Sequence, residues 1–204
     1  MRLTQIDLRI VRLPLLDRET WTYWPTADRD RAAADFRRIF DAHRPRMVIF
    51  GAPDNPTSQI LPQSLVDTMR ERTADSGAWL AVDFAYKCQY FAPPPAYYSW
   101  SPADHPQVIG IHSNSKWGRG LGRRLGWLTA APAVVEAVER VQQCSLLCPD
   151  TLSQMTMTRY LSTAIDDGIA AYLPPCRSAV RRNCSLHSSN AAVYRSRASA
   201  SKFI

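Results

Sequence analysis

Short apolar segments alternate with amphipathic helical segments through the middle of this chain, and that alternation restricts the fold more than any other feature. The apolar segments have the length and composition of buried strands and occupy residues 46–50, 78–82, 108–111 and 125–128. Helical periodicity covers residues 28–43, 62–76, 132–143 and 150–167. Near-continuous apolar strands separated by helices are typical of α/β proteins. The sequence therefore predicts a mostly parallel sheet flanked by helices.

Local signals add detail to this expectation. Asp28 directly precedes the first helical segment and is predicted to cap it, while Gly77 should end the second. Residues 6–13 alternate partly between polar and apolar types and end at Pro14, which indicates an earlier strand. Residues 92–106 are rich in proline and aromatic residues, so we expect an irregular excursion over the surface.

The positive charge is concentrated at one end of the chain. The net charge is +7, but residues 176–204 hold six basic residues and no acidic ones, which leaves 19 basic against 18 acidic residues elsewhere. A nearly neutral body lacks the positive surface of a nucleic-acid-binding protein, so we expect no nucleic-acid partner. We divide the chain into an ordered domain, residues 1–173, and a basic Ser/Arg-rich tail, residues 174–204, whose composition predicts disorder.

Targeting and cysteine patterns exclude several classes of protein. No apolar run approaches the roughly 20 residues that cross a bilayer, and the N-terminus lacks the apolar core of a signal peptide. We therefore expect a cytoplasmic protein without a membrane partner. The five cysteines are odd in number and irregularly spaced, which argues against a disulfide framework. Cys144 and Cys148 have no second pair to complete a zinc site, so no metal site is predicted.

Polar side chains come at the ends of the predicted strands, where α/β sheets bind their ligands. These residues are Asn55, Asp83, Tyr86, Ser113, Ser115 and Lys116. Lys116 is one of only three lysines, and arginine supplies nearly all the other positive charge. A lysine here suggests a role for a titratable amine rather than a fixed cation. Alternatively, Lys116 is a solvated cation in a loop, and the nearby glycines only form turns.

The residue types in this set suit pyridoxal phosphate. A lysine amine that can lose its proton forms a Schiff base with an aldehyde. A carboxylate beside a pyridine nitrogen keeps that ring protonated and electron-withdrawing. A phenol and an amide can hydrogen-bond a ring oxygen, and two hydroxyls with an arginine suit a phosphate dianion.

Four motifs, in order, resemble the cofactor-binding core of the fold-type I aminotransferases of class I and II. They are Asp54-Asn55-Pro56-Thr57-Ser58, Asp83-x-x-Tyr86, Ser113-x-Ser115-Lys116 and Arg124-x-Gly126. The resemblance runs from about residue 46 to about residue 160. It implies part of the large domain of a pyridoxal-phosphate-dependent transferase, an amino-acid substrate, and a homodimer if the enzyme is complete.

The resemblance also implies a role for each matching residue near the ring of the cofactor. Lys116 would carry the Schiff base and transfer a proton between substrate and cofactor. Asp83 would pair with the pyridine nitrogen, while Asn55 and Tyr86 would bind the ring oxygen. The structural alternatives are Asp83 as a helix cap and Tyr86 as a core residue.

The phosphate would be bound by Ser113, Ser115 and Arg124, unless Arg124 is only surface charge. The chain departs from the family pattern at Ser58, where glycine is usual, and at Phe84, where a small or acidic residue is usual. We find no upstream glycine-rich turn for the phosphate, no segment for an aromatic that stacks on the ring, and no C-terminal small domain. We therefore expect a truncated and incomplete enzyme.

Several functions remain open at this stage. Transamination of an amino acid is the main hypothesis. The motifs around Asn55 and Lys116 are also similar to those of pyridoxal-phosphate arginine oxidases and hydroxylases, which use dioxygen, so oxidation of a basic amino acid is an alternative. A non-catalytic fragment is another, and weak nucleic-acid binding through the basic tail is a further one.

Overall fold

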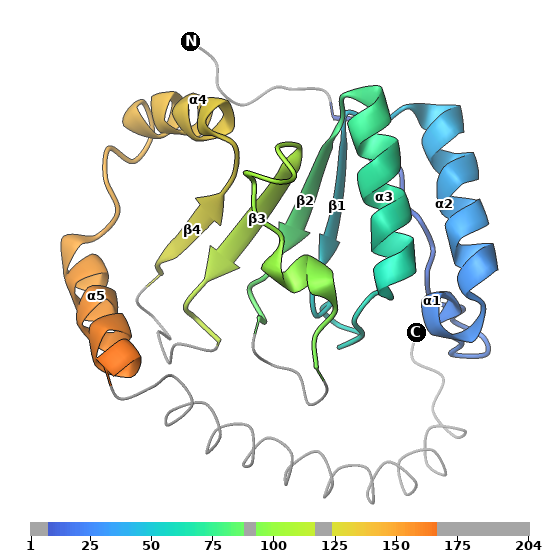
Figure 1. Cartoon of the computed structure of the whole chain (residues 1–204), viewed down its shortest axis with the longest axis horizontal. Coiled ribbons are helices and arrows are strands. Elements are labelled where there is room, and N and C mark those ends of the chain that lie inside the picture. The colour runs from blue at the N-terminus through green and yellow to red at the C-terminus, as the bar shows by residue number, and fades with distance from the viewer. Residues whose placement is uncertain (1–7, 88–92, 117–123, 167–204) are drawn as a thin grey trace, which may run out of the picture.

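The computed structural model describes residues 8–87, 93–116 and 124–166. In this part of the chain a four-stranded sheet has the order β1-β2-β3-β4 (Figure 1). The strands are β1 (Met47–Gly51), β2 (Trp79–Asp83), β3 (Val108–Ser113) and β4 (Gly126–Thr129). β1, β2 and β3 are parallel, and β4 runs antiparallel to β3. The predicted mostly parallel sheet is therefore confirmed, with every strand within two residues of its expected bounds.

The helices also follow the sequence pattern. They are α1 (Trp24–Ala27), α2 (Arg29–His43), α3 (Gln63–Ser76), the 3₁₀ helix η1 (Ala96–Ser99), α4 (Pro132–Gln143) and α5 (Thr151–Asp166). Asp28 caps α2 as predicted, because its carboxylate accepts a hydrogen bond from the Arg31 N–H at 3.0 Å. Helix α3 ends at Gly77, whose φ of +68° is the left-handed conformation that glycine adopts without strain.

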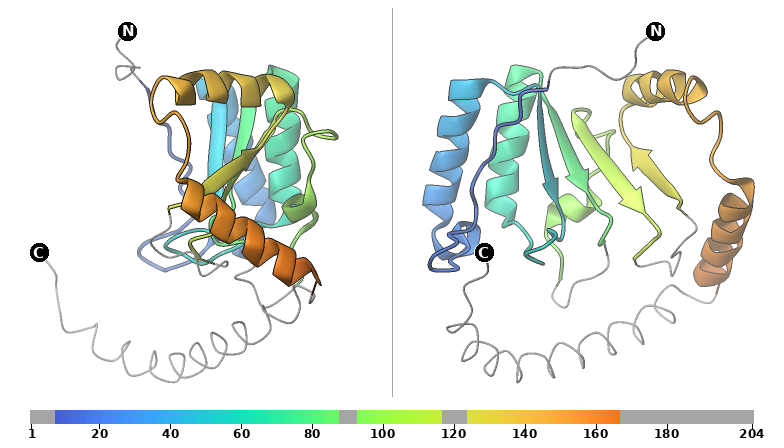
Figure 2. Two further views of the ribbon diagram at one scale, coloured as in Figure 1. Left: turned by 90° about the vertical axis from the view of Figure 1, so that its left-hand side faces the viewer. Right: turned by 180° about the vertical axis from the view of Figure 1, so that it is seen from behind.

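One face of the sheet carries the core. α3 packs against β1 and β2, and α2 packs against α3 (Figure 1, Figure 2). Leu65 and Val66 of α3 meet Leu80 and Val82 of β2 in one cluster, and none of these four side chains is more than 2% exposed. Burial of this apolar area is the main driving force for assembling these elements.

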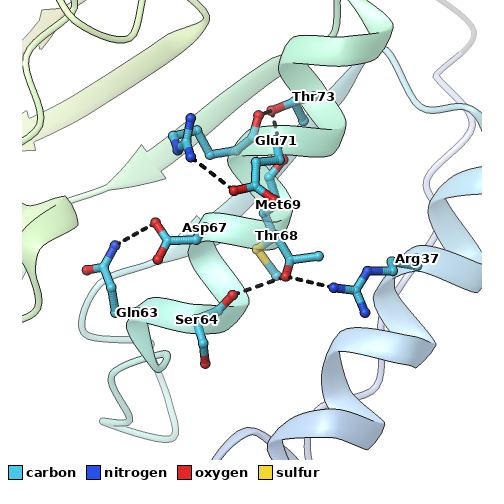
Figure 3. A network of polar contacts seen from close by, with 9 residues as sticks. Arg37, Gln63, Ser64, Asp67, Thr68, Met69, Glu71 and Thr73 are labelled. Carbon is cyan, nitrogen blue, oxygen red and sulfur yellow. Dashed lines mark hydrogen bonds and ion pairs between the residues drawn. The ribbon is translucent and has the colours of Figure 1, made fainter.

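Helix α3 also carries a network of polar contacts on its surface (Figure 3). The Thr68 hydroxyl donates to the Ser64 carbonyl at 3.1 Å and accepts a hydrogen bond from Arg37 of α2 at 3.4 Å. The Gln63 amide donates to Asp67 at 2.9 Å, one turn further along the helix. Of these contacts only the Arg37–Thr68 hydrogen bond crosses from α2 to α3, so the two helices are joined by one polar contact in addition to apolar packing.

The other face of the sheet is apolar but open. Met47 and Ile49 of β1 are 49% and 63% exposed, and Ile111 of β3 is 38% exposed. The strand register places Met47 and Ile49 beside Trp79 and Ala81 on this same face. Helices α4 and α5 lie beyond β4 rather than next to α2 and α3 (Figure 1).

Two local expectations were wrong. Residues 8–13 form no strand: Leu8 and Ile10 are 74% and 79% exposed, because alternation gives strand propensity but no described strand lies beside them to pair with. The segment from residue 93 to 106 is not confined to the surface, since Tyr97 and Tyr98 are 1% and 3% exposed. Tyr97 can be buried because its hydroxyl donates to the carbonyl of Leu61 at 3.2 Å.

Some expectations fall outside the described residues. These are the tail at residues 174–204, the first two residues of the expected N-terminal strand, and residue 92. Among the helices that the structure describes, none combines the length and the apolar character needed to cross a membrane.

Candidate functional site

The ends of the strands are held together at the edge of the sheet where the predicted site residues lie. Backbone hydrogen bonds continue past the last strand residues, so the loops that follow start from fixed positions. They join the Ala52 N–H to the Asp83 carbonyl (2.8 Å), the Phe84 N–H to the Ile111 carbonyl (2.7 Å) and the Asn114 N–H to the Leu125 carbonyl (3.3 Å).

The turn after β1 is braced by Asp54. Its carboxylate accepts hydrogen bonds from the Thr57 hydroxyl at 2.5 Å and the Thr57 N–H at 3.4 Å, and its carbonyl accepts one from the Ser58 N–H at 2.8 Å. Ser58 has a φ of +56°, in the region that favours glycine. The turn therefore has, at Ser58, a backbone conformation that suits the glycine usual in the family, and it presents Asn55 at the sheet edge.

Three of the predicted site residues meet above this edge. The Asn55 side-chain amide donates a hydrogen bond to the Tyr86 hydroxyl at 3.3 Å. The Lys116 ammonium lies over the Tyr86 ring, 5.4 Å from its centroid, within the range of a cation–π contact. Asn55 follows β1, Tyr86 follows β2 and Lys116 follows β3, so the fold brings together groups that are 31 and 30 residues apart in sequence.

The two predicted serines also face one another. The Ser113 hydroxyl donates to the Ser115 hydroxyl at 3.1 Å and accepts from the Ser115 N–H at 3.2 Å. Between them Asn114 is 3% exposed, and its side-chain carbonyl oxygen has no hydrogen-bond partner among the described residues.

Asp83 is the last residue of β2 and is half-buried. Its Oδ1 accepts a hydrogen bond from the Ala85 N–H at 2.9 Å, which closes a turn of the Asx type. The alternative that Asp83 caps a helix is wrong, because a turn and not a helix follows it. The Oδ1 contact fixes the carboxylate and leaves Oδ2 without a hydrogen bond among the described residues.

Arg124 is not brought into contact with the two serines. Its side chain is exposed, and no hydrogen bond or ion pair joins it to the other residues that the structure describes. Its backbone is nevertheless close to them, because β4 pairs with β3 through Gly126 and Ser113. A Cβ at Gly126 would lie 2.8 Å from the His112 carbonyl oxygen, which explains why glycine stands there.

The sequence reasoning missed His112. Its ring lies between Phe84 and Trp127, at centroid distances of 5.3 and 5.4 Å, and its Nε2 is 3.1 Å from the Thr129 hydroxyl. Burial lowers the pKa of His112 to about 4, with a further lowering from Lys87 and a smaller opposing effect of Asp83. A signal was present, because the alternation of β3 places His112 on the same face as buried Val108 and Gly110.

A cleft lies at the opposite edge of the sheet, where β1 and β2 begin. This polar cleft is lined by the C-terminal ends of α2 and α3 and includes Asp41, Arg44, Arg46, Arg72 and Asp75. Arg72 forms an ion pair with Asp41, so part of its positive charge is already compensated. None of the predicted site residues lines this cleft. Among the described residues, no three potential metal-ligating side chains gather at one point.

Comparison with known proteins identifies aminotransferases as relatives of this chain. The family model of aminotransferase class I and II matches residues 11–172. Histidinol-phosphate aminotransferase of Thermobifida fusca is 33% identical over 136 residues, which are 63% of this chain and 35% of that protein. The probable aspartate/prephenate aminotransferase of Thermus aquaticus is 23% identical over 160 residues, 78% of this chain and 41% of that protein. The chain therefore spans about a third to two fifths of these relatives.

Solved structures support the same fold. Aspartate aminotransferase from Thermus thermophilus, in a single-mutant form, superposes with a TM-score of 0.70 at 20% identity, over 79% of this chain and 41% of that chain. At this identity the likeness concerns the fold alone. The matched sequence extends beyond the four motifs at both ends, and the strand order gathers those motifs at one sheet edge. The chain thus belongs to the aminotransferase class I and II family.

Proposed function

We propose that this chain binds pyridoxal 5'-phosphate at the sheet edge that carries Asn55, Tyr86 and Lys116, and that it takes part in transamination of an amino acid. When bound, the cofactor supplies an electron sink for the carbon that loses a proton. The family uses this cofactor, and the donor set at the edge has the chemistry the cofactor requires. Because the chain spans only part of its relatives, cofactor binding is the property to test first.

The convergence of three strand ends supports the proposal most. Asn55 donates to the Tyr86 hydroxyl at 3.3 Å, which leaves the phenol proton able to donate onward to a ring oxygen. The Lys116 ammonium over the Tyr86 ring places an amine beside that donor. A lysine that attacks an aldehyde has to lose a proton first, and the exposed position of Lys116 at the sheet edge gives its amine access to the aldehyde.

The serine pair suits the phosphate. Ser113 and Ser115 present two hydroxyls 3.1 Å apart, one residue from the positive charge of Lys116. A phosphate dianion accepts several short hydrogen bonds and is favoured by a nearby cation. Arg124 would complete this cradle by reorienting its exposed side chain toward the serines, from a backbone position already paired to the end of β3.

Asp83 is suited to the pyridine nitrogen. Its Oδ1 accepts a hydrogen bond from the Ala85 N–H, so the backbone sets the orientation of the carboxylate. Its Oδ2 could then accept a hydrogen bond from the protonated pyridine nitrogen. A carboxylate in that position stabilises the protonated ring. Asp83 and Ser113 lie on the same, open face of the sheet, one strand apart.

An absorbance titration tests the proposal. Adding pyridoxal phosphate to the full chain should shift the absorption spectrum of the cofactor saturably. The Lys116→Arg variant keeps the cation over Tyr86 but cannot condense with an aldehyde, so it should abolish the shift. Lys87→Arg serves as the matched control and should leave the shift intact. A folded wild-type chain that gives no saturable shift would refute the proposal.

Oxidation of a basic amino acid is an alternative reaction for the same site. Its support is the similarity of the motifs around Asn55 and Lys116 to pyridoxal-phosphate arginine oxidases and hydroxylases. An oxygen electrode separates the two reactions, because only the oxidase consumes dioxygen with arginine and needs no keto-acid acceptor. The names of the relatives make histidinol phosphate and aspartate the first amino donors to try for transamination.

A further inference from the structure

A row of stacked rings lies under the candidate site. Phe84, His112 and Trp127 follow one another at centroid distances of 5.3 and 5.4 Å, with interplanar angles of 17° and 8°. The Lys87 ammonium lies over the Phe84 ring, 5.0 Å from its centroid. Each ring comes from a different strand or strand end, and the register places Phe84, His112 and Trp127 at one level across β2, β3 and β4.

Each ring is next in sequence to a residue of the candidate site. Phe84 follows Asp83, His112 precedes Ser113, and Trp127 follows Gly126 of the last motif. Successive side chains of a strand point to opposite faces, so the His112 ring lies on the core face while Ser113 lies on the open face. A displacement of the ring would therefore be transmitted to the serine through one backbone unit.

The surroundings of His112 are built around its hydrogen bond. A Cβ at Gly110 would lie 2.5 Å from the Thr129 hydroxyl and 2.8 Å from His112 Nε2, so any larger residue would separate the two groups. The two groups are 3.1 Å apart across β3 and β4. Glycine within a strand weakens it, and the space for this hydrogen bond gives a reason for tolerating that cost.

We infer that His112 is a positioning residue for the cofactor site, which holds Ser113 in place for the phosphate through its hydrogen bond to Thr129, while Phe84 and Trp127 enclose its ring. This inference rests on the proposed function. His112 itself does not reach the open face, so it acts through Ser113 rather than on the cofactor.

Two substitutions separate this role from plain packing. His112→Phe keeps a ring in the stack but loses the hydrogen bond to Thr129. His112→Gln keeps a hydrogen-bonding group but loses the ring. If His112 only fills space, phenylalanine should be the better replacement. If it positions Ser113 through Thr129, glutamine should be the better replacement for cofactor binding.

The experiment measures the dissociation constant of pyridoxal phosphate and the thermal midpoint of the same full-length variants. We expect His112→Phe and Thr129→Val each to weaken binding by about three- to ten-fold, the effect of one lost hydrogen bond. Their thermal midpoints should stay within a few degrees of wild type, and His112→Gln should bind more tightly than His112→Phe.

The double variant His112→Phe/Thr129→Val should be no worse than either single variant, because both remove the same bond. Wild-type affinity in His112→Phe and Thr129→Val would overturn the inference while leaving the proposed function standing. Losses that follow the thermal midpoints, with phenylalanine better than glutamine, would also overturn it. A wild-type chain that binds no cofactor would refute both.

Discussion

At the scale of single residues, the candidate site depends on side chains that are fixed by their neighbours before any ligand arrives. Asp83 is held by the Ala85 N–H, and Tyr86 is held by Asn55. Such preorganisation is what a binding site requires, because the entropy of ordering the groups is lost during folding and not during binding. His112 is fixed in the same way, because its ring is stacked between Phe84 and Trp127 on the opposite face of the sheet from Ser113.

The depressed pKa of His112 predicts a pH dependence of stability. Its pKa is lowered to about 4, by burial first and by Lys87 second, with Asp83 opposing. A histidine in the unfolded chain titrates near 6.5. Between about pH 6.5 and 4 the unfolded chain therefore takes up a proton that the folded chain does not, so the free energy of unfolding should fall as the pH is lowered through this window.

Urea unfolding at pH 7 and at pH 5 measures this effect. Wild type should lose stability between the two values, and His112→Gln should lose less because it has no imidazole to titrate. Equal losses in the two proteins would assign the pH dependence to other groups.

At the scale of elements, the turn between β1 and α3 carries a strain that can be removed. Ser58 has a φ of +56°, which costs an L-residue about 1 kcal/mol. Ser58→Gly should therefore raise the free energy of unfolding by up to about 1 kcal/mol. The matched change is Gly77→Ala at a φ of +68°, where a Cβ meets nothing within 4 Å, so the backbone alone should lower stability by a similar amount.

Denaturant midpoints of the two variants give the measurement. The two changes should shift the midpoint in opposite directions without altering the slope of the transition. A Ser58→Gly variant less stable than wild type would show that the serine side chain contributes more than the strain costs.

The elements themselves were largely predictable from the sequence. The strands at 47–51 and 79–83 and the helix at 132–143 follow from apolar runs and helical periodicity, which are local properties. The expected strand is absent at residues 8–13 because pairing is not local: Leu8 and Ile10 alternate correctly, but no strand in the described part of the chain lies beside them. The burial of Tyr97 was missed for the same reason, since its N–H donates to Gln63 at the start of α3 and its hydroxyl donates to the carbonyl of Leu61 just before that helix.

The sequence predicted which residues lie at the candidate site, but not the contacts that hold them in place. The rule that ligands bind beyond the carboxyl ends of parallel strands is enough to place Asn55, Tyr86 and Lys116 at one edge. No sequence pattern reveals that Asn55 bonds to Tyr86, or that Gly110 leaves room for His112 and Thr129. Those facts depend on the strand register. Whether these residues bind the cofactor stays a prediction.

At the scale of the whole molecule, the described part is a half-covered sheet. α2 and α3 cover one face, while Met47, Ile49 and Ile111 remain exposed on the other. The matched segments cover only 35% and 41% of the two relatives described above. The sheet edge that carries the candidate site is nevertheless formed within this chain, because all four motifs lie on or directly beside its own strands.

The proposed function requires the Lys116 amine to condense with pyridoxal phosphate, and borohydride reduction followed by peptide mapping detects that bond. The chain has only three lysines, Lys87, Lys116 and Lys202, so a reduced cofactor can be assigned to one of them. We expect stoichiometric labelling of the peptide that contains Lys116, unchanged in Lys87→Arg and Lys202→Arg. Labelling spread over the three lysines, or none at Lys116 in the folded chain, would contradict it.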